Sequence, residues 1–285
     1  MYKVAILGCE NSHANGFLNH VIKNKVVTDI EFVGVYSEDR EAAEKLNQEF
    51  GVPVADSYDQ FVGQVDGIII TARHGDNHYK YAKPYIASGI PMFIDKPITC
   101  TEDDAKAFMA ELKANNIRVS GGSVCVLSEH VQNLKKAVAE QTYGKVFGGF
   151  LRAPLNITNP WGNFHFYCQH LVQVMMEIFG NYPKSVMAYK NQITYTCVVR
   201  YEDYDVTIAY EDGNGLYYAG ISCENDFVGS TYSDFPFDKE FLEFYELLLG
   251  HAQKKSYEDF FAPVYIHNAI ERSIASGKEE VIRYF

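Results

Sequence analysis

The chain has 285 residues, more than a single hydrophobic core usually holds, so two domains are expected. Hydrophobic residues make up 47% and charged residues 22% of the chain, a composition typical of globular rather than disordered proteins. The net charge of −12 repels phosphates and no run of Lys or Arg is present, so neither nucleic acid nor a membrane surface is a predicted partner.

No apolar run is long enough to cross a bilayer, and the apolar stretch at the start is too short for a signal peptide. The six cysteines are scattered, with no C-x-x-C pair and no zinc spacing. Reduced, buried thiols and no metal site are therefore predicted. These features favour a cytoplasmic location.

Residues 1–122 alternate apolar runs with stretches of helical periodicity, which is typical of a parallel α/β sheet. Predicted strands cover 4–7, 30–36, 67–71, 92–94 and 117–120, and predicted helices cover 14–21, 43–50 and 105–112. Gly51 and Gly89 suit the left-handed position after a helix, and Thr101 suits a helix start. A further helical segment is predicted at 78–87, and Pro84 within it should kink this helix or delay its start. These units predict a doubly wound Rossmann domain with a ligand crevice at the carboxyl ends of its strands.

The pattern changes from residue 123, so 123–285 is predicted to be a second, substrate-binding α/β domain. Helices are predicted at 128–139 and 163–179, and strands at 146–151, 186–190, 193–201, 206–210 and 216–222. Turn residues at the strand junctions predict an open, largely antiparallel sheet. Two helical stretches end the chain, and the last is considered for packing back towards the N-terminal domain. The exposed face of the sheet favours a homodimer or higher homo-oligomer.

The turn after the first strand reads Gly8-Cys9-Glu10-Asn11-Ser12-His13. A dinucleotide fingerprint, G-x-G-x-x-G, brings backbone N–H groups close to a pyrophosphate, and only its first glycine is present here. Asn11 or Ser12 is expected to cap the following helix. Glu10 is expected to point away from phosphate or to accept a hydrogen bond from Asn11, Ser12 or His13, so that Glu10→Gly would not weaken cofactor binding. A plain capped turn explains this motif as well as an anion site does.

A more specific motif ends the strand at 92–94, where Asp95-Lys96-Pro97 follows a buried run. Here the chain resembles the glucose–fructose oxidoreductase/inositol 2-dehydrogenase (Gfo/Idh/MocA) family, in which the corresponding strand ends in Glu-Lys-Pro. The segment 67–78 is similar to the family's preceding strand and loop, and 40–53 to its second helix and turn. The likeness covers 2–122 and, more loosely, the element order beyond. It implies a nicotinamide cofactor, held by Gly8, Asn11, Ser12, His13, Ser37, Glu38, Ala72, Arg73, His74, His78, Asp95 and Lys96.

Lys96 is the first catalytic candidate, because a lysine at a strand's carboxyl end beside the cofactor crevice supplies positive charge where an alkoxide develops. A purely structural salt bridge with Asp95 is the alternative interpretation.

His170 is the second catalytic candidate, because the resemblance implies a histidine here that exchanges a proton with a substrate hydroxyl. Relatives place an aspartate four residues earlier, where this chain has Phe166. An incidental histidine on a solvated polar stripe is the alternative. Trp161, His165 and Tyr167 are predicted substrate contacts. Aliphatic residues at 124–126 replace the polar residues that many relatives carry, which leaves the substrate class open.

The end of the second strand, Ser37-Glu38-Asp39, bears on cofactor choice, because acidic side chains there repel the 2′-phosphate of NADP. NAD is therefore favoured, with NADP not excluded. The resulting hypothesis is a dehydrogenase that transfers hydride between the cofactor and a hydroxyl of a sugar, polyol or related molecule. Two alternatives remain: a non-catalytic binding or regulatory protein, and an enzyme that uses bound NAD transiently for elimination or epimerisation.

Overall fold

The structure is a computed structural model that describes residues 1–285, and the chain folds into two compact units. The first comprises Met1–Gly122 together with Phe237–Tyr257, and the second comprises Ser123–Pro236 together with Glu258–Phe285. The main division falls at the boundary where the sequence pattern changes.

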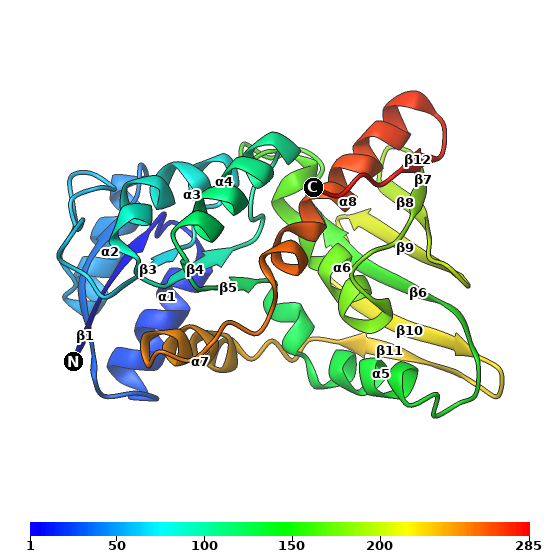
Figure 1. Cartoon of the computed structure of the whole chain (residues 1–285), viewed down its shortest axis with the longest axis horizontal. Coiled ribbons are helices and arrows are strands. Elements are labelled where there is room, and N and C mark those ends of the chain that lie inside the picture. Colours follow the sequence, from blue (N-terminus) through cyan, green and yellow to red (C-terminus); the bar gives the residue numbers. More distant parts are fainter. The chain divides into compact units, whose positions relative to one another are not determined.

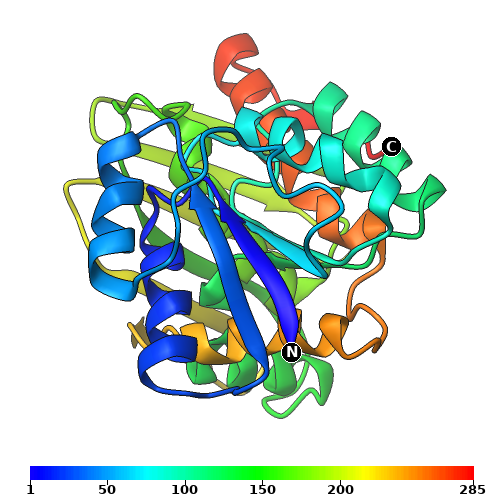
Figure 2. The same cartoon turned by 90° about the vertical axis from the view of Figure 1, so that its left-hand side faces the viewer.

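The first unit is built on a five-stranded sheet in the order β2-β1-β3-β4-β5, with every neighbouring pair parallel. The strands are β1 (Tyr2–Leu7), β2 (Ile30–Tyr36), β3 (Gly67–Ile70), β4 (Met92–Asp95) and β5 (Val119–Gly122). Strands β3 and β4 are buried along their whole length, which explains their continuous apolar runs. The predicted doubly wound Rossmann sheet is confirmed (Figures 1 and 2).

The helices of this unit are α1 (Ser12–Leu18), continued by the π-helical turn η1 (Asn19–Lys23), then α2 (Arg40–Phe50), α3 (Asp76–Ala82) and α4 (Glu102–Ala114). Thr101 caps α4 by accepting a hydrogen bond from Asp104 N, and Gly51 and Gly89 follow their helices with φ of 72° and 71°. Pro84 does not delay a helix. Instead α3 ends before it and a 3₁₀ segment, η2 (Lys83–Ser88), carries it near its start, where a missing N–H costs little.

Helix α7 (Phe237–Leu248) also belongs to the first unit, although it lies more than a hundred residues beyond β5. Phe241, Phe244 and Leu248 join the same buried cluster as Phe17 and Phe93, and α7 runs beside α1 (Figure 1). The helix that returns to the N-terminal domain is therefore not the last one, as the sequence suggested, but the one before it.

The second unit contains a seven-stranded sheet in the order β11-β10-β6-β9-β8-β7-β12. Its strands are β6 (Val146–Leu155), β7 (Ser185–Lys190), β8 (Thr194–Arg200), β9 (Asp205–Asp212), β10 (Tyr217–Cys223), β11 (Phe227–Tyr232) and β12 (Glu280–Val281). Only β6 and β9 pair in parallel, so the predicted open, largely antiparallel sheet is confirmed. Strands β11 and β12 were not predicted.

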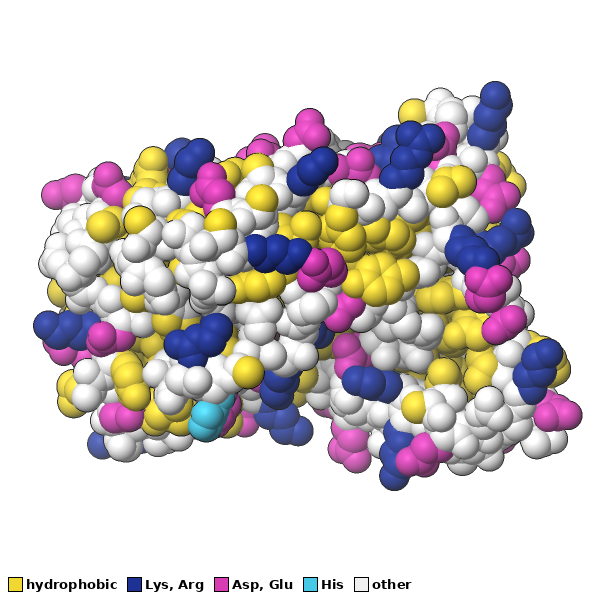
Figure 3. Space-filling model, viewed as in Figure 1, with side chains coloured by type: hydrophobic (Ala, Val, Ile, Leu, Met, Phe, Trp, Pro, Cys, Tyr) yellow, Lys and Arg dark blue, Asp and Glu magenta, His cyan; other side chains and the backbone are white.

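The helices of the second unit are a 3₁₀ turn, η3 (Val124–Leu127), followed by α5 (Glu129–Ala139), α6 (Phe164–Phe179) and α8 (Tyr257–Ser276). Helix α5 packs against β10 and β11, and α6 packs against β6 and β9. A Cβ on Gly149 of β6 would lie 2.3 Å from Phe179 of α6, so the glycine lets that helix approach the sheet. No helix in the structure is long and apolar enough to span a membrane. On the face seen in Figure 3, Lys and Arg side chains lie scattered among Asp and Glu side chains.

Candidate functional site

The carboxyl ends of the parallel strands in the first unit bring together the predicted cofactor residues. Gly8 follows β1 with φ of 75°, and a Cβ there would lie 2.4 Å from the Cα of Ala72, which follows β3. Only glycine allows these two loops to approach so closely. Gly8 therefore has the role of the first fingerprint glycine, which allows a tight turn after the strand.

Glu10 occupies the place of the second fingerprint glycine, and its carboxylate is tethered on both sides. Oε2 accepts a hydrogen bond from the Ser37 hydroxyl at 2.7 Å, and Oε1 accepts one from the backbone N–H of Arg73 at 2.9 Å. The predicted partners Asn11, Ser12 and His13 are wrong. The side chain reaches across to the ends of β2 and β3, the edge of a Rossmann sheet at which a dinucleotide binds.

The two acidic side chains at the end of β2 make contacts within the protein. Glu38 pairs with Lys80, with Oε1 and Nζ 2.8 Å apart, and Asp39 caps α2 by accepting from Ala42 N. The hydrogen bond from Lys80 holds the pKa of Glu38 below its usual value. Glu38 and Asp39, which were expected to repel the 2′-phosphate of NADP, are thus engaged with Lys80 and α2. The carboxylate that is hydrogen-bonded to Ser37 is that of Glu10.

Asn11 and His13 turn inwards, and neither Asn11 nor Ser12 caps α1 with its side chain, contrary to expectation. Asn11 Nδ2 donates to Asp95 Oδ2 at 2.8 Å. The buried ring of His13 has Nδ1 3.3 Å from Asp95 Oδ2 and Nε2 3.3 Å from Glu240 Oε2 of α7, although neither contact has hydrogen-bond geometry. His13, which occupies the place of the third fingerprint glycine, thus packs α1 against β4 and α7.

The cluster around Lys96 is deeply buried and ionisable. Burial lowers the pKa of His13 and raises those of Asp95 and Glu240, so it favours the neutral form of each group. Lys96 is 4% exposed, and its positive charge lowers the pKa values of both acids. Its backbone N–H donates to Asp95 Oδ1 at 2.7 Å, and the Lys96–Pro97 peptide bond is cis. Asp95 thus fixes the backbone that carries the lysine.

The loop after β3 contains Ala72, Arg73 and His74, which are predicted cofactor contacts. His78 supports this loop from within α3, because its Nε2–H donates to Ala72 O at 2.7 Å and its side chain is completely buried. Burial lowers the pKa of His78 to about 4. His74 is half-buried, and its Nδ1 accepts from Asp76 N at 3.3 Å. His78 is therefore placed to order the loop.

In the second unit, His170 lies on α6 and is 6% exposed, so it does not belong to a solvated polar stripe. Its Nδ1 lies 2.7 Å from the Ser123 hydroxyl and 3.5 Å from Cys125 Sγ. Ser123 Oγ also accepts from Cys125 N, which fixes the hydroxyl at the start of η3. Ser123, which directly precedes the aliphatic departure expected at 124–126, is thus the polar partner that orients this imidazole.

Two tyrosine rings lie beside His170: that of Tyr167, a predicted substrate contact, and that of Tyr217, which was not predicted. The Tyr167 ring lies 5.3 Å and the Tyr217 ring 6.3 Å from the imidazole, centroid to centroid. Tyr217 also contacts Tyr232, whose hydroxyl is buried without a hydrogen-bond partner. Burial raises the pKa values of Tyr217 and Tyr232, so both remain protonated hydrogen-bond donors at neutral pH.

The other predicted substrate contacts differ in their surroundings. Trp161 packs on Phe166, with ring centroids 5.0 Å apart, and Phe166 fills the place of the family's aspartate with a buried ring. His165 instead faces α8, where its Nδ1 lies 3.0 Å from His267 Nδ1 and its Nε2 lies 2.7 Å from Glu271 Oε2. Both nitrogens of His165 therefore already have protein partners, whereas Tyr167 lies beside His170.

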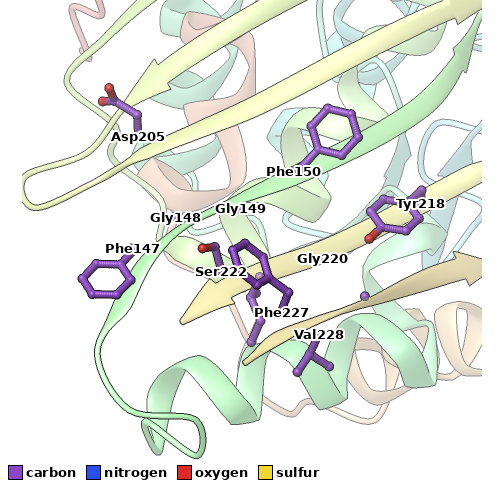
Figure 4. Close-up of a pocket in the computed structure, with 12 residues that line it drawn as sticks. Phe147, Gly148, Gly149, Phe150, Asp205, Tyr218, Gly220, Ser222, Phe227 and Val228 are labelled. Carbon is purple, nitrogen blue, oxygen red and sulfur yellow. The ribbon is translucent and has the colours of Figure 1, made fainter. Parts of the chain in front are cut away.

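A shallow hollow of about 340 Å³ lies on the outer face of the second sheet, lined by β6, β10 and β11 (Figure 4). Gly149 faces α6, so the next residue, Phe150, points to the opposite face, where it is 41% exposed. Phe147 and Phe227 in the same lining are also exposed. The hollow therefore lies away from the face that α6 covers.

The parallel sheet and the close approach of Gly8 to the loop after β3 are typical of a dinucleotide-binding Rossmann domain. Residues 2–123 match the family model GFO_IDH_MocA, described as an oxidoreductase family with an NAD-binding Rossmann fold. Residues 2–123 thus match the dinucleotide-binding domain of the Gfo/Idh/MocA family, and the NAD-binding Rossmann fold expected from the sequence is confirmed.

Solved structures extend the likeness to the whole chain. Myo-inositol 2-dehydrogenase from Lactobacillus plantarum has a TM-score of 0.85 at 14% identity, and 99% of each chain is covered. Scyllo-inositol dehydrogenase from Lactobacillus casei, solved with NAD(H) and scyllo-inositol, has a TM-score of 0.84 at 13% identity, again with 99% of each chain covered. No curated protein sequence matches the chain significantly. At these identities the likeness shows the fold of both units.

Proposed function

We propose that this protein transfers a hydride between NAD and a hydroxyl-bearing carbon of a polyol, sugar or related small molecule. The observation that carries the proposal is the buried Lys96 at the carboxyl end of β4, within a domain that matches an NAD-binding oxidoreductase family. The inositol dehydrogenase solved with scyllo-inositol supports the substrate class.

The residues at the strand ends fit a dinucleotide. Gly8 leaves its loop without a side chain against Ala72, and the tethered Glu10 carboxylate offers acceptors for ribose hydroxyls. The loop that His78 supports forms the other wall. When bound, the nicotinamide supplies the hydride acceptor or donor. Glu10 also brings negative charge to the adenosine side, which favours NAD over NADP.

The protein's own residues would handle charge and protons. The Lys96 ammonium would donate to the substrate oxygen and stabilise negative charge that develops on it. His170 would exchange the hydroxyl proton, with its ring orientation set by Ser123. Tyr167, Tyr217 and Tyr232 would offer ring faces and hydroxyl donors to a polyol.

The experiment is an assay of a panel of inositols and sugars with NAD, followed by variants on the best substrate. Lys96→Met should abolish turnover while NAD affinity, measured by calorimetry, and folding stay largely unchanged. His170→Ala should lower the rate about a hundredfold or more. The double variant should lose much less than the sum of the two free-energy effects, because both residues serve one step.

Three results would redirect the proposal. Normal activity of Lys96→Met would remove the lysine from the mechanism. Turnover without net NADH formation would indicate transient oxidation for elimination or epimerisation. Absence of any NAD or NADP binding would favour a non-catalytic regulatory protein.

We also propose a homo-oligomer that forms through the outer face of the second sheet, where exposed aromatic side chains gather around the shallow hollow. All six cysteines are buried and none forms a disulfide, which suits the reducing cytoplasm that we propose as the location.

A further inference from the structure

Two helices of the second unit place a cluster of soft and borderline ligand groups next to one another. Helix α6 carries His165 and Cys168, an H-x-x-C spacing on one helical face, and α8 carries His267 and Glu271, an H-x-x-x-E spacing. The ligand atoms of the two histidines and the cysteine all lie within 4.8 Å of one another. More than 90 residues separate the two pairs in the sequence, so a search for neighbouring cysteines does not find them.

The distances between the nitrogen atoms are close to those of a tetrahedral metal site. His165 Nδ1 lies 3.0 Å from His267 Nδ1. Two nitrogens bound to one tetrahedral zinc ion at about 2.0 Å stand roughly 3.3 Å apart. Cys168 Sγ lies 3.7 Å from the carbonyl oxygen of His165, on the same turn of α6. A small separation of the rings and a rotation of the cysteine would bring all three atoms onto one ion.

The protonation pattern supports ligation by the Nδ1 atoms. His165 Nε2 lies 2.7 Å from Glu271 Oε2, so this nitrogen carries the proton and Nδ1 is left with a lone pair. A carboxylate that holds the outer nitrogen of a ligating histidine is a common feature of metal sites.

Burial makes the cluster a built site with an entrance. His267 and Cys168 have no exposed surface, whereas the side chains of His165 and Glu271 are 14% and 44% exposed. His267 Nε2 has no hydrogen-bond partner, so the polar contacts of this ring are confined to its Nδ1 edge, which faces His165. An ion could enter from the Glu271 side and meet the buried donors behind it.

We propose that His165, Cys168 and His267 form a binding site for a zinc-class divalent cation, with Glu271 orienting His165 and water completing the coordination. The ion replaces the single proton that the two facing Nδ1 atoms share, and that proton moves to the other nitrogen of His267. The Cys168 thiol loses its proton to solvent, so one proton is released per ion bound. The site ties α8 to the first turns of α6, the helix that carries Tyr167 and His170. It is independent of the proposed oxidoreductase activity.

The test uses the full-length protein after treatment with a chelator, with Co²⁺ and then Zn²⁺ as probes. One equivalent of Co²⁺ should produce a thiolate-to-cobalt charge-transfer band together with intense tetrahedral d–d bands, and Zn²⁺ should displace it. Cys168→Ser should abolish the charge-transfer band. Cys223→Ser is the matched control, because Cys223 is also a buried cysteine of the same unit that forms no disulfide, and it should leave the band unchanged.

Glu271→Gln provides a variant at a partly exposed position that should fold normally. It should weaken Co²⁺ affinity by about 10- to 100-fold, as expected when the group that orients a ligating histidine is lost. The absence of a stoichiometric cobalt spectrum in the natural protein overturns the proposal, as does an unchanged charge-transfer band in Cys168→Ser. Either result would leave Glu271, His165 and His267 as a hydrogen-bonded triad that holds two helices together.

Discussion

Glu10 places a carboxylate where the family fingerprint has a glycine, and its contacts with Ser37 and Arg73 N reverse the sequence-based expectation. A carboxylate held at the ribose position contributes about 1.5–3 kcal/mol through charged hydrogen bonds. Glu10→Gln should therefore weaken NAD binding about tenfold or more and narrow the preference over NADP. Glu38→Gln should change neither the NAD affinity nor the preference for NAD over NADP, because the Glu38 carboxylate is paired with Lys80. Calorimetric titration of each variant with NAD and with NADP measures both quantities. Unchanged NAD affinity in Glu10→Gln would show that the carboxylate does not touch the ribose.

Ser123 holds the imidazole of His170, the residue that we propose exchanges a proton with the substrate. Ser123→Ala should lower kcat about tenfold and shift the pH profile of kcat/KM, because the Nδ1 of His170 loses its hydroxyl partner. Ser230→Ala is the matched control, since it removes a hydroxyl 3.3 Å from the Nδ1 of another histidine, His130, on the surface of the same unit. Equal pH profiles for the two variants would count against a positioning role for Ser123.

His78 makes stability depend on pH in a predictable direction. Its pKa is lowered from 6.5 to about 4, so the unfolded state binds this proton more readily than the folded state does. Its contribution is therefore complete above pH 6.5 and is lost progressively as the pH falls towards about 4. Between about pH 7 and 5 the free energy of unfolding should drop by about 2 kcal/mol from this group alone.

Urea titrations of the natural protein and of His78→Gln at both pH values measure this term. The variant should start from lower stability, because the buried hydrogen bond to Ala72 O is altered, but it should lose about 2 kcal/mol less between the two pH values. Identical pH dependence in both proteins would mean that His78 does not titrate as its burial indicates.

At the scale of elements, α7 docks on the first sheet through a contact that only glycine permits. A Cβ at Gly67 of β3 would lie 2.7 Å from Leu248 Cδ2 and 3.0 Å from Phe244 Cζ. Gly67→Ala should therefore destabilise the protein by about 1–3 kcal/mol through overpacking. Gly16→Ala in α1 meets no atom within 4 Å and should instead stabilise by about 0.5–1 kcal/mol. Denaturant midpoints distinguish the two, and a Gly67→Ala variant as stable as the natural protein would contradict this packing.

Most helices and strands could be predicted from the sequence, because each of them buries one face or is buried completely. The strands β2, β3 and β4 are fully or half buried, so their apolar runs are local signals. Strand β11 lies at the sheet edge, and most of its residues are exposed or half-exposed, so it lacks the alternation that identifies a strand. Helix α7 was found as a helix, but its partner sheet is set by non-local packing that periodicity does not encode.

Some residues of the candidate site could likewise be predicted from the sequence, and others could not. Lys96 and Gly8 follow predicted strands directly, so the sequence places them at the sheet edge. Ser123 and Tyr217 reach His170 from η3 and β10, and Tyr232 of β11 packs on Tyr217. Glu240 reaches His13 from α7. No local spacing links these residues, because the folding of each unit brings them together. The H-x-x-C and H-x-x-x-E pairs are visible one helix at a time, and only the packing of α6 with α8 makes them one cluster.

For the whole molecule, the outer face of the second sheet predicts self-association. Phe147, Phe150 and Phe227 are 54%, 41% and 82% exposed, and they border one hollow. A stable interface buries about 800 Å² per partner, which a sheet face of this kind can supply and which hides these rings from water. The protein should therefore be an oligomer by light scattering at micromolar concentration.

Phe150→Glu combined with Phe227→Glu should shift it to monomer, because two carboxylates would have to be buried at each copy of the interface. Val62→Glu, which adds charge at another exposed apolar residue, in the first unit, should leave the mass unchanged. Circular dichroism must show that the double variant remains folded. A monomeric natural protein, or an oligomer that survives both glutamates, would place any self-association on another surface.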